Sequence, residues 1–93
     1  MKEKQFIILI IYDIVDNKTR SRMVKCLEQY GVRVQKSAFE ALLTEVQYRK
    51  LIRESQRIIN HQVDSLRVYI LDDVVNVYTW GIGERKEQDC IIL

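Results

Sequence analysis

The sequence predicts an α+β fold in which two helices lie on one face of an antiparallel sheet. Apolar segments of strand character alternate with two segments of helical periodicity, and each helical segment follows a recognisable N-terminal cap. The chain has 93 residues, the size of one small domain. With 47% hydrophobic and 30% charged residues, its composition is that of a globular chain rather than a disordered one.

The first strand and the first helix are expected near the start of the chain. Residues 6–12 form an uninterrupted apolar run rich in β-branched side chains, which favours a strand buried on both faces. Asp13 follows where this strand leaves the sheet. Asp16 and Asn17 are both candidate N-caps for a helix from about Lys18 to Tyr30. Gly31, which permits a left-handed residue, is expected at its C-terminal cap.

The middle of the chain predicts a bent strand and a second helix. In Val32–Leu43 the apolar residues occupy even positions at first and odd positions later. Because side chains alternate along a strand, this switch predicts a bulge or tight bend near Lys36–Ser37, in one long bent strand or two short ones. Thr44 and Gln47 then form a capping-box pattern, which predicts a helix from Glu45 to about Asn60.

The last third of the chain predicts further strands. Ser65–Leu71 alternates in hydrophobicity, and after a turn at Asp72–Asp73 the segment Val74–Trp80 is expected to be its hairpin partner. The charged residues 84–89 are expected to form an exposed connector. Cys90–Leu93 is expected to be a short final strand that pairs with a sheet edge, of this subunit or of another.

Together these elements predict a ferredoxin-like sandwich of order β-α-β-(β)-α-β-β, with the domain over residues 1–83 and the connector and pairing strand over residues 84–93. Both helices then cover one face of the sheet, and the opposite face is uncovered. A second copy packed sheet against sheet would bury it, so we expect a homodimer.

Charge is distributed unevenly along the chain. Residues 1–57 contain twelve Lys and Arg against seven Asp and Glu, a net charge of +5, whereas residues 58–93 contain three against six, a net charge of −3. This asymmetry could give a basic face suited to phosphates, or it could simply be a solvated surface.

We expect a cytoplasmic protein with no membrane partner. The charged start MKEKQ does not resemble a signal peptide, and no segment reaches the roughly 18 apolar residues of a membrane span. The end of the chain, Cys90-Ile91-Ile92-Leu93, does fit the C-a-a-X prenylation pattern. Because the preceding segment is mixed in charge rather than polybasic, we set the anchor aside in favour of an edge strand.

Asp13 is the leading candidate for chemistry. A carboxylate is a hard oxygen ligand that suits magnesium, although a strand-end Asp can also simply cap the following turn. One carboxylate makes a poor metal site within a single chain. Two chains related by a two-fold axis could bring two copies of Asp13 together.

Several other side chains are candidates for contacts with nucleic acid. Arg20, Arg22 and Arg33 could bind phosphates through their planar guanidinium groups, or could be ordinary surface charges. Tyr12 and Phe39 could stack on bases, or could belong to the core or an interface.

A resemblance to a known family adds to these observations. The matching features are the apolar strand that ends in Tyr12-Asp13, the basic start of the first helix, and the pattern Tyr30-Gly31-x-Arg33-Val34-Gln35-x-Ser37-x-Phe39-Glu40. In these features the chain resembles the small spacer-acquisition proteins of CRISPR systems, known also as CRISPR-associated endoribonucleases, which are partners of the CRISPR integrase. The resemblance covers about residues 6–72.

The resemblance implies a ferredoxin-like homodimer in which the two copies of Asp13 face each other across a magnesium or manganese site. It implies metal-dependent cleavage of RNA or DNA, and also a non-catalytic role in which the dimer bridges two integrase dimers and holds the duplex DNA that becomes a new spacer. Positions that support nucleic-acid contact or cleavage in the family correspond here to Tyr12, Arg20, Arg22, Arg33, Ser37 and Phe39.

The leading hypothesis is therefore a dimeric, nucleic-acid-binding protein of CRISPR adaptation with endonuclease activity that depends on Asp13. A scaffold without turnover is the main alternative, and a toxin-like messenger-RNA interferase is a further one.

Overall fold

The computed structural model describes residues 3–71 of the chain. In this part it contains four strands and two helices, in the order expected from the sequence. Their bounds are β1 Gln5–Asp13, α1 Asn17–Glu28, β2 Gly31–Gln35, β3 Ala38–Thr44, α2 Glu45–Ile58 and β4 Ser65–Leu71.

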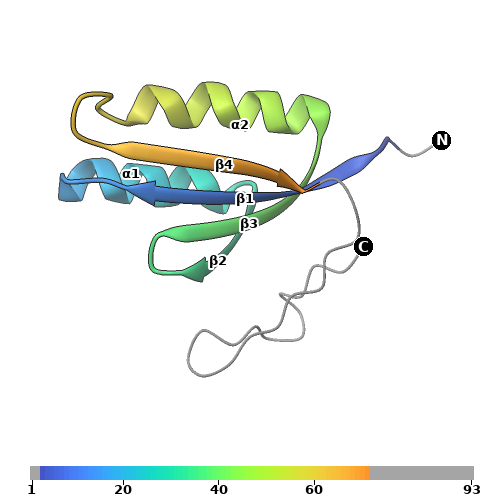
Figure 1. Ribbon diagram of the computed structural model, residues 1–93, viewed down its shortest axis with the longest axis horizontal. Helices are drawn as coiled ribbons and strands as arrows, with labels where there is room; N and C mark the ends of the chain where they lie inside the picture. The colour runs from blue at the N-terminus through green and yellow to red at the C-terminus, as the bar shows by residue number, and fades with distance from the viewer. Residues whose placement is uncertain (1–2, 72–93) are drawn as a thin grey trace.

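The four strands form one antiparallel sheet in the order β2-β3-β1-β4. Strand β1 is central and pairs along its length with both β3 and β4. Both helices lie on one side of this sheet, with α1 behind β1 and α2 beside β4 in Figure 1. This is the predicted α+β sandwich of ferredoxin-like order.

The core lies between the sheet and the helices. Ile8, Ile10 and Tyr12 of β1 are at most 2% exposed, and they share a buried cluster with Met23 of α1 and Leu51 of α2. Since side chains alternate along a strand, every second residue of β1 faces these helices. The expectation of a strand buried on both faces is therefore confirmed only for the face that meets the helices.

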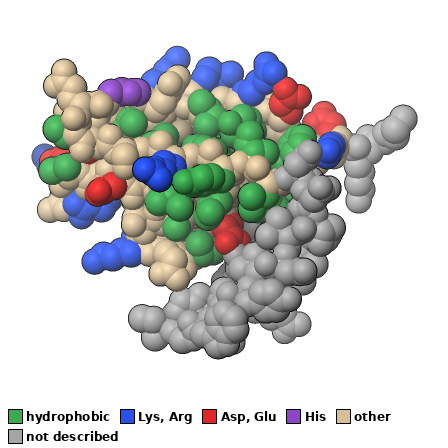
Figure 2. Space-filling view, viewed as in Figure 1, with side chains coloured by type: hydrophobic (Ala, Val, Ile, Leu, Met, Phe, Trp, Pro, Cys, Tyr) green, Lys and Arg blue, Asp and Glu red, His purple; other side chains and the backbone are tan. Residues whose placement is uncertain are grey.

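The other face of the sheet carries the intervening residues of β1. Leu9 and Asp13 lie on it, together with Ile11, which is 38% exposed, and Tyr69 of β4, which is 42% exposed. Figure 2 looks onto this open face and shows apolar side chains gathered over its middle. The sheet therefore presents an apolar surface with a carboxylate at one end.

The first helix begins at Asn17, one residue before the expected start, and ends earlier than expected. The carboxylate of Asp16 is its N-cap and accepts from the backbone N–H of Thr19. The helix ends at Glu28, with Gln29 as its C-cap in the right-handed region. The expected left-handed cap at Gly31 is wrong, because Gly31 begins β2 and its φ lies outside the left-handed region.

Gly31 is required for space instead. A Cβ at this position would overlap the carbonyl oxygen of Glu40 on the paired strand β3 and would lie 2.8 Å from the Cβ of Ala41. Glycine thus allows close approach of β2 to β3, in a conformation that other residues could adopt.

The parity change in Val32–Leu43 is resolved by two strands rather than one bent strand. Strands β2 and β3 form a hairpin whose turn is Lys36–Ser37, and the pairing register shifts between Arg33 and Gln35. Both the tight bend and the irregularity expected from the sequence are therefore present.

The second helix confirms its predicted start. Thr44 Oγ1 accepts from the N–H of Gln47, and Gln47 Oε1 accepts from the N–H of Thr44, which completes the capping box. The helix ends at Ile58, within two residues of the expected end. Its one fully buried polar side chain, Ser55, donates to the carbonyl of Leu51 at 2.8 Å.

The two helices are tied together by a polar contact. Tyr30, just after α1, donates through its hydroxyl to Glu54 Oε1 of α2 at 2.5 Å. Burial of the hydroxyl and the neighbouring carboxylate of Glu54 raise the pKa of Tyr30 well above its ordinary value.

The predictions for the C-terminal part lie outside the described residues. These are the hairpin strand Val74–Trp80, the connector 84–89, the final strand Cys90–Leu93 and the division between residues 1–83 and 84–93. In the part that the structure does describe, no helix is long and apolar enough to cross a membrane.

Replacing Gly31 tests the close approach of β2 and β3. Gly31→Ala should lower the free energy of unfolding by about 1–3 kcal/mol, because the added methyl group forces the paired strands apart. Chemical denaturation measures the change. The exposed neighbour Gln29→Ala is the control and should stay within about 0.5 kcal/mol of wild type; equal stability of the two variants would contradict this role of Gly31.

The Tyr30–Glu54 contact predicts a loss of stability in alkali. Above about pH 10 Tyr30 ionises in the unfolded chain but stays protonated in the folded one, so the unfolded state loses a proton first and stability falls as pH rises. Denaturation at about pH 9 to 11 should therefore show a steeper fall for wild type than for Tyr30→Phe. Equal slopes for wild type and Tyr30→Phe would refute the assignment.

Candidate functional site

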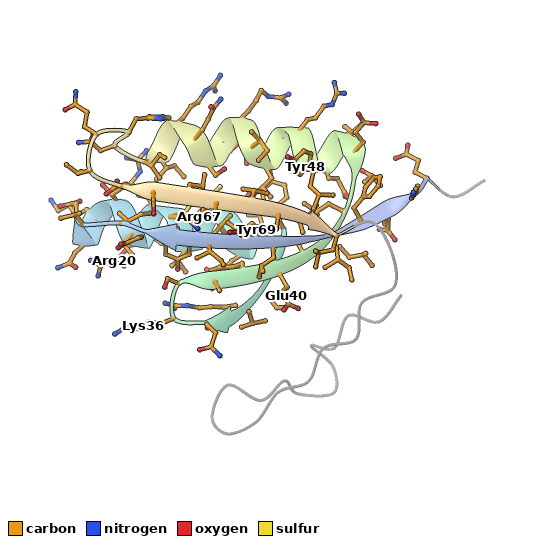
Figure 3. The ribbon with its side chains drawn as sticks, viewed as in Figure 1. Arg20, Lys36, Glu40, Tyr48, Arg67 and Tyr69 are labelled. Carbon is orange, nitrogen blue, oxygen red and sulfur yellow. The ribbon has the colours of Figure 1, made fainter. Side chains whose placement is uncertain are left out.

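A shallow groove lies at the end of β1 where the strand leaves the sheet. Its volume is about 460 Å³, and we call it the Asp13 groove. Figure 3 shows two of its residues, Arg20 and Lys36, at this end of the molecule. The groove is lined by Ile11, Tyr12, Asp13, Ile14, Arg20, Lys36 and Ser37. Four of the residues predicted from the sequence thus meet here: Tyr12, Asp13, Arg20 and Ser37.

Asp13 is the carboxylate of this groove. It is exposed, is the last residue of β1, and lies opposite Ser65 of β4. Within residues 3–71 its side chain has no hydrogen bond or ion pair. Its oxygens are therefore free to accept from a ligand or to bind a cation.

The other acidic residues near this end of the sheet have structural partners. Asp16 accepts from the N–H and the hydroxyl of Thr19, at 2.9 and 3.0 Å, and these hydrogen bonds lower the pKa of Asp16. Asp64 accepts from the N–H of Val15 at 3.0 Å and from the N–H of Asn60 at 2.8 Å. Both carboxylates serve to order loops.

Few groups near Asp13 in the described part of one chain are therefore available to bind a metal ion. Residues 3–71 contain no group of three or more His, Cys, Asp or Glu side chains placed to hold a metal ion. A divalent cation would fit at Asp13 only if further oxygen donors came from water, substrate or a second copy of the chain. This agrees with the expectation that a single chain is incomplete.

The carbonyl oxygen of Lys36 organises one wall of the groove. It accepts from the hydroxyl of Tyr12 at 3.2 Å and from Nε and Nη2 of Arg33 at 3.2 and 2.5 Å. The N–H of Tyr12 also donates to the carbonyl of Ser37 at 3.1 Å. The β2–β3 turn is thereby fixed beside Asp13.

Arg20 fixes the loop on the other side of the groove. Its Nε and Nη2 donate to the carbonyls of Ile14 and Val15, both at 3.2 Å, and its Nη1 donates to Asn17 Oδ1 at 2.9 Å. All three guanidinium nitrogens thus have partners, two in the loop that follows Asp13 and one in the first residue of α1. In this arrangement Arg20 acts first as a positioning residue.

The remaining predicted residues do not line the groove. Phe39 is fully buried, with its ring centroid 6.3 Å from that of Tyr12, so both aromatic side chains occupy core positions. Arg33 lies on the edge strand β2 and holds the turn. Arg22 is exposed on α1, beside Lys18 and Lys25. Contact of these residues with nucleic acid stays a prediction.

Two cations near Asp13 were missed by sequence reasoning. Lys36 lines the groove from the β2–β3 turn. Arg67 lies opposite Ile11, so it is the diagonal cross-strand neighbour of Asp13 on the open face, at a distance typically about 7–8 Å between Cα atoms. Figure 3 shows Arg67 and Tyr69 projecting from β4 over this face. The alternating hydrophobicity of Ser65–Leu71 indicates which residues share a face with Arg67. It does not indicate the pairing of β4 with β1, which is what brings Arg67 near Asp13.

These features define a class of small α+β proteins with an open sheet face and a free carboxylate at the end of the central strand. A family model described as CRISPR associated protein Cas2 matches residues 6–76. A CRISPR-associated endoribonuclease Cas2 of Chloroflexus aurantiacus is 44% identical over 77 residues, which cover 81% of this chain and 83% of that protein. The chain belongs to the Cas2 family, as the resemblance in its sequence indicated.

Solved structures agree with this assignment. A hypothetical protein of Thermus thermophilus has a TM-score of 0.74 and 34% identity, over 83% of this chain and 94% of its own. A chain of a partial Cas6-RT-Cas1–Cas2 complex has a TM-score of 0.62 and 33% identity, over 73% of this chain and 75% of its own.

The hydrogen bond of Tyr12 to the turn can be tested by removing one oxygen atom. Tyr12→Phe should lower the free energy of unfolding by about 1 kcal/mol, since one buried donor to the Lys36 carbonyl is lost while Arg33 remains. Tyr48→Phe removes the same atom from a side chain of α2 whose hydroxyl makes no hydrogen bond within residues 3–71, and it should have a much smaller effect. Two equal values from chemical denaturation would show that the Tyr12 contact does not stabilise the fold.

Proposed function

We propose that this protein acts in the acquisition of new CRISPR spacers, as a homodimer that binds nucleic acid and associates with the CRISPR integrase. Family membership supports this proposal, as does the likeness to a chain of a Cas1–Cas2 complex. We further propose that the dimer has endonuclease activity toward RNA or DNA, in line with the name of the Chloroflexus relative.

The open face of the sheet supports a dimer. Leu9, Ile11 and Tyr69 form an apolar surface on it, and a second copy packed against this surface would remove it from water. Asp13 is on the same face and at its end. A two-fold axis through this end of the sheet would therefore bring the two copies of Asp13 together.

The observation that carries the proposed cleavage is that Asp13 has free oxygens while Asp16 and Asp64 are engaged. The paired Asp13 carboxylates would hold magnesium or manganese, which can polarise a phosphate and lower the pKa of a bound water. Arg67 and Lys36 lie next to the carboxylate and would balance negative charge that develops on the scissile phosphate.

The residues around Asp13 would position this chemistry rather than perform it. Arg20 holds the loop after Asp13, and the hydroxyl of Tyr12 holds the turn that carries Lys36. Because these contacts are made to backbone carbonyls of the groove, the groove is pre-ordered before any ligand arrives.

A scaffold without catalytic activity is the second candidate. The small set of metal-binding groups favours it, since the described residues of one chain supply a single free carboxylate in the Asp13 groove. The likeness to a chain of a Cas1–Cas2 complex favours it as well. In that case the dimer would hold duplex DNA and bridge integrase subunits, and Asp13 would not be needed for turnover.

A nuclease assay of Asp13→Ala distinguishes the two candidates. Loss of the metal ligand should reduce cleavage of RNA or duplex DNA by at least about 100-fold, and a chelator should have a similar effect on wild type. The assay compares wild type and variant with magnesium, with manganese and with chelator.

The matched control is Asp16→Asn. It removes the neighbouring negative charge, but the amide oxygen still accepts from Thr19, so the helix cap and the cleavage should both persist. Cleavage that survives in pure Asp13→Ala would overturn the metal mechanism. No cleavage by any of the three proteins, with duplex binding intact, would favour the scaffold.

A further inference from the structure

The outer side of α2 carries cations that the Asp13 groove does not use. Lys50, Arg53 and Arg57 are exposed and recur at intervals of three and four residues, so they lie along one side of the helix. At a rise of about 1.5 Å per residue this row is roughly 10 Å long. We call these three residues the α2 stripe. Figure 2 shows Lys and Arg side chains gathered along the edge of the molecule over α2.

No carboxylate of α2 forms an ion pair with the stripe within the described residues. Glu45 pairs with Arg49 at 2.6 Å, and Glu54 accepts from the hydroxyl of Tyr30. Within residues 3–71, no ion pair joins Lys50, Arg53 or Arg57 to an acidic side chain. Three like charges on one side of a helix repel one another, and a bound anion would relieve this repulsion.

The stripe and the Asp13 groove belong to opposite sides of the sheet. Helix α2 packs through Leu51 onto the core face of the sheet, where Ile8 and Ile10 lie, whereas Asp13 is on the open face. A ligand bound along the stripe therefore cannot at the same time reach Asp13 of the same chain by a direct contact. In a dimer formed through the open faces, the stripe would stay exposed on the outside of each subunit.

We propose that the α2 stripe is a separate binding surface for the phosphate backbone of duplex nucleic acid. The stripe offers cationic donors with no aromatic side chain among them, and such a set binds phosphates without reading sequence. It also accounts for much of the basic excess in residues 1–57. This inference rests on the proposed binding of nucleic acid, but it does not depend on cleavage.

The test is a salt titration of duplex binding by the full chain. The probe is a fluorescent DNA duplex of mixed sequence, about 30 base pairs long, and the triple variant is Lys50→Gln, Arg53→Gln, Arg57→Gln. Glutamine keeps a similar helix propensity, and circular dichroism confirms that the helix is intact. With three phosphate contacts removed, affinity should fall at least about tenfold near 100 mM salt. The slope of log K against log salt should decrease by about 2.7, at 0.9 for each phosphate.

Two single variants supply the matched control. Arg49→Gln and Arg53→Gln change the same charge one turn apart on α2, but Arg49 is paired with Glu45 and Arg53 is not paired within the described residues. Arg53→Gln should weaken binding and lower the slope by about 0.9, while Arg49→Gln should change both much less. Equal effects of the two variants would show that only net charge matters, which overturns the proposal.

The outcomes separate this inference from the proposed function. If wild type and the triple variant bind equally well, the stripe is not a nucleic-acid surface and the proposed function is untouched. If the triple variant loses only its association with the integrase, the stripe binds an acidic protein instead, and the proposal is wrong. If wild type binds no duplex at all, the proposed function fails as well.

Discussion

The alternation of side chains along β1 is the constraint on which the rest of the structure depends. β1 is paired on both sides, so its backbone has no freedom to twist a side chain from one face to the other. Ile8 and Ile10 therefore face the helices, and Asp13 lies on the open face. A shift of one residue in register would bury the carboxylate and expose the core. The location of the candidate site is thus a consequence of how the core is packed.

The polar contacts at the end of β1 hold the neighbouring segments in place and do not supply reactive groups. The carbonyl of Lys36, the guanidinium of Arg20 and the carboxylate of Asp64 each join two segments that meet at this end of the sheet. Such contacts are short-range and directional, and they satisfy backbone groups in loops that have no sheet partner. What they leave unused is the carboxylate of Asp13, the one acidic side chain among the described residues that line the groove.

Local features of the fold could be predicted from the sequence, and long-range ones could not. The caps at Asp16 and Thr44 involve residues that are close in sequence. The turn at Lys36–Ser37 is indicated by the switch of apolar residues from even to odd positions. The role of Gly31 was mistaken because glycine serves equally for a left-handed cap and for close contact with another strand. Only the partner strand β3 decides between the two.

The same distinction holds for the candidate site. Asp13 was found because a charge at the end of an apolar run is a local signal. Arg67 was missed because its proximity to Asp13 depends on the pairing of two strands that are more than 50 residues apart. The alternation of apolar residues within a strand does not show which residue of another strand lies opposite. The sequence left open whether Tyr12 and Phe39 belong to the core or face a ligand. Their burial shows that both occupy core positions, and a role in the family's chemistry stays a prediction.

The small donor set has a consequence for the thermodynamics of metal binding. If the ion is shared between two copies of Asp13, each chain is half a site, and formation of the loaded species is second order in protein. The ion would then act as a linked ligand of dimerisation: it would tighten the dimer, and the apparent metal affinity would rise with the concentration of the chain. At low abundance the same carboxylate would be an ordinary solvated charge on a separate subunit.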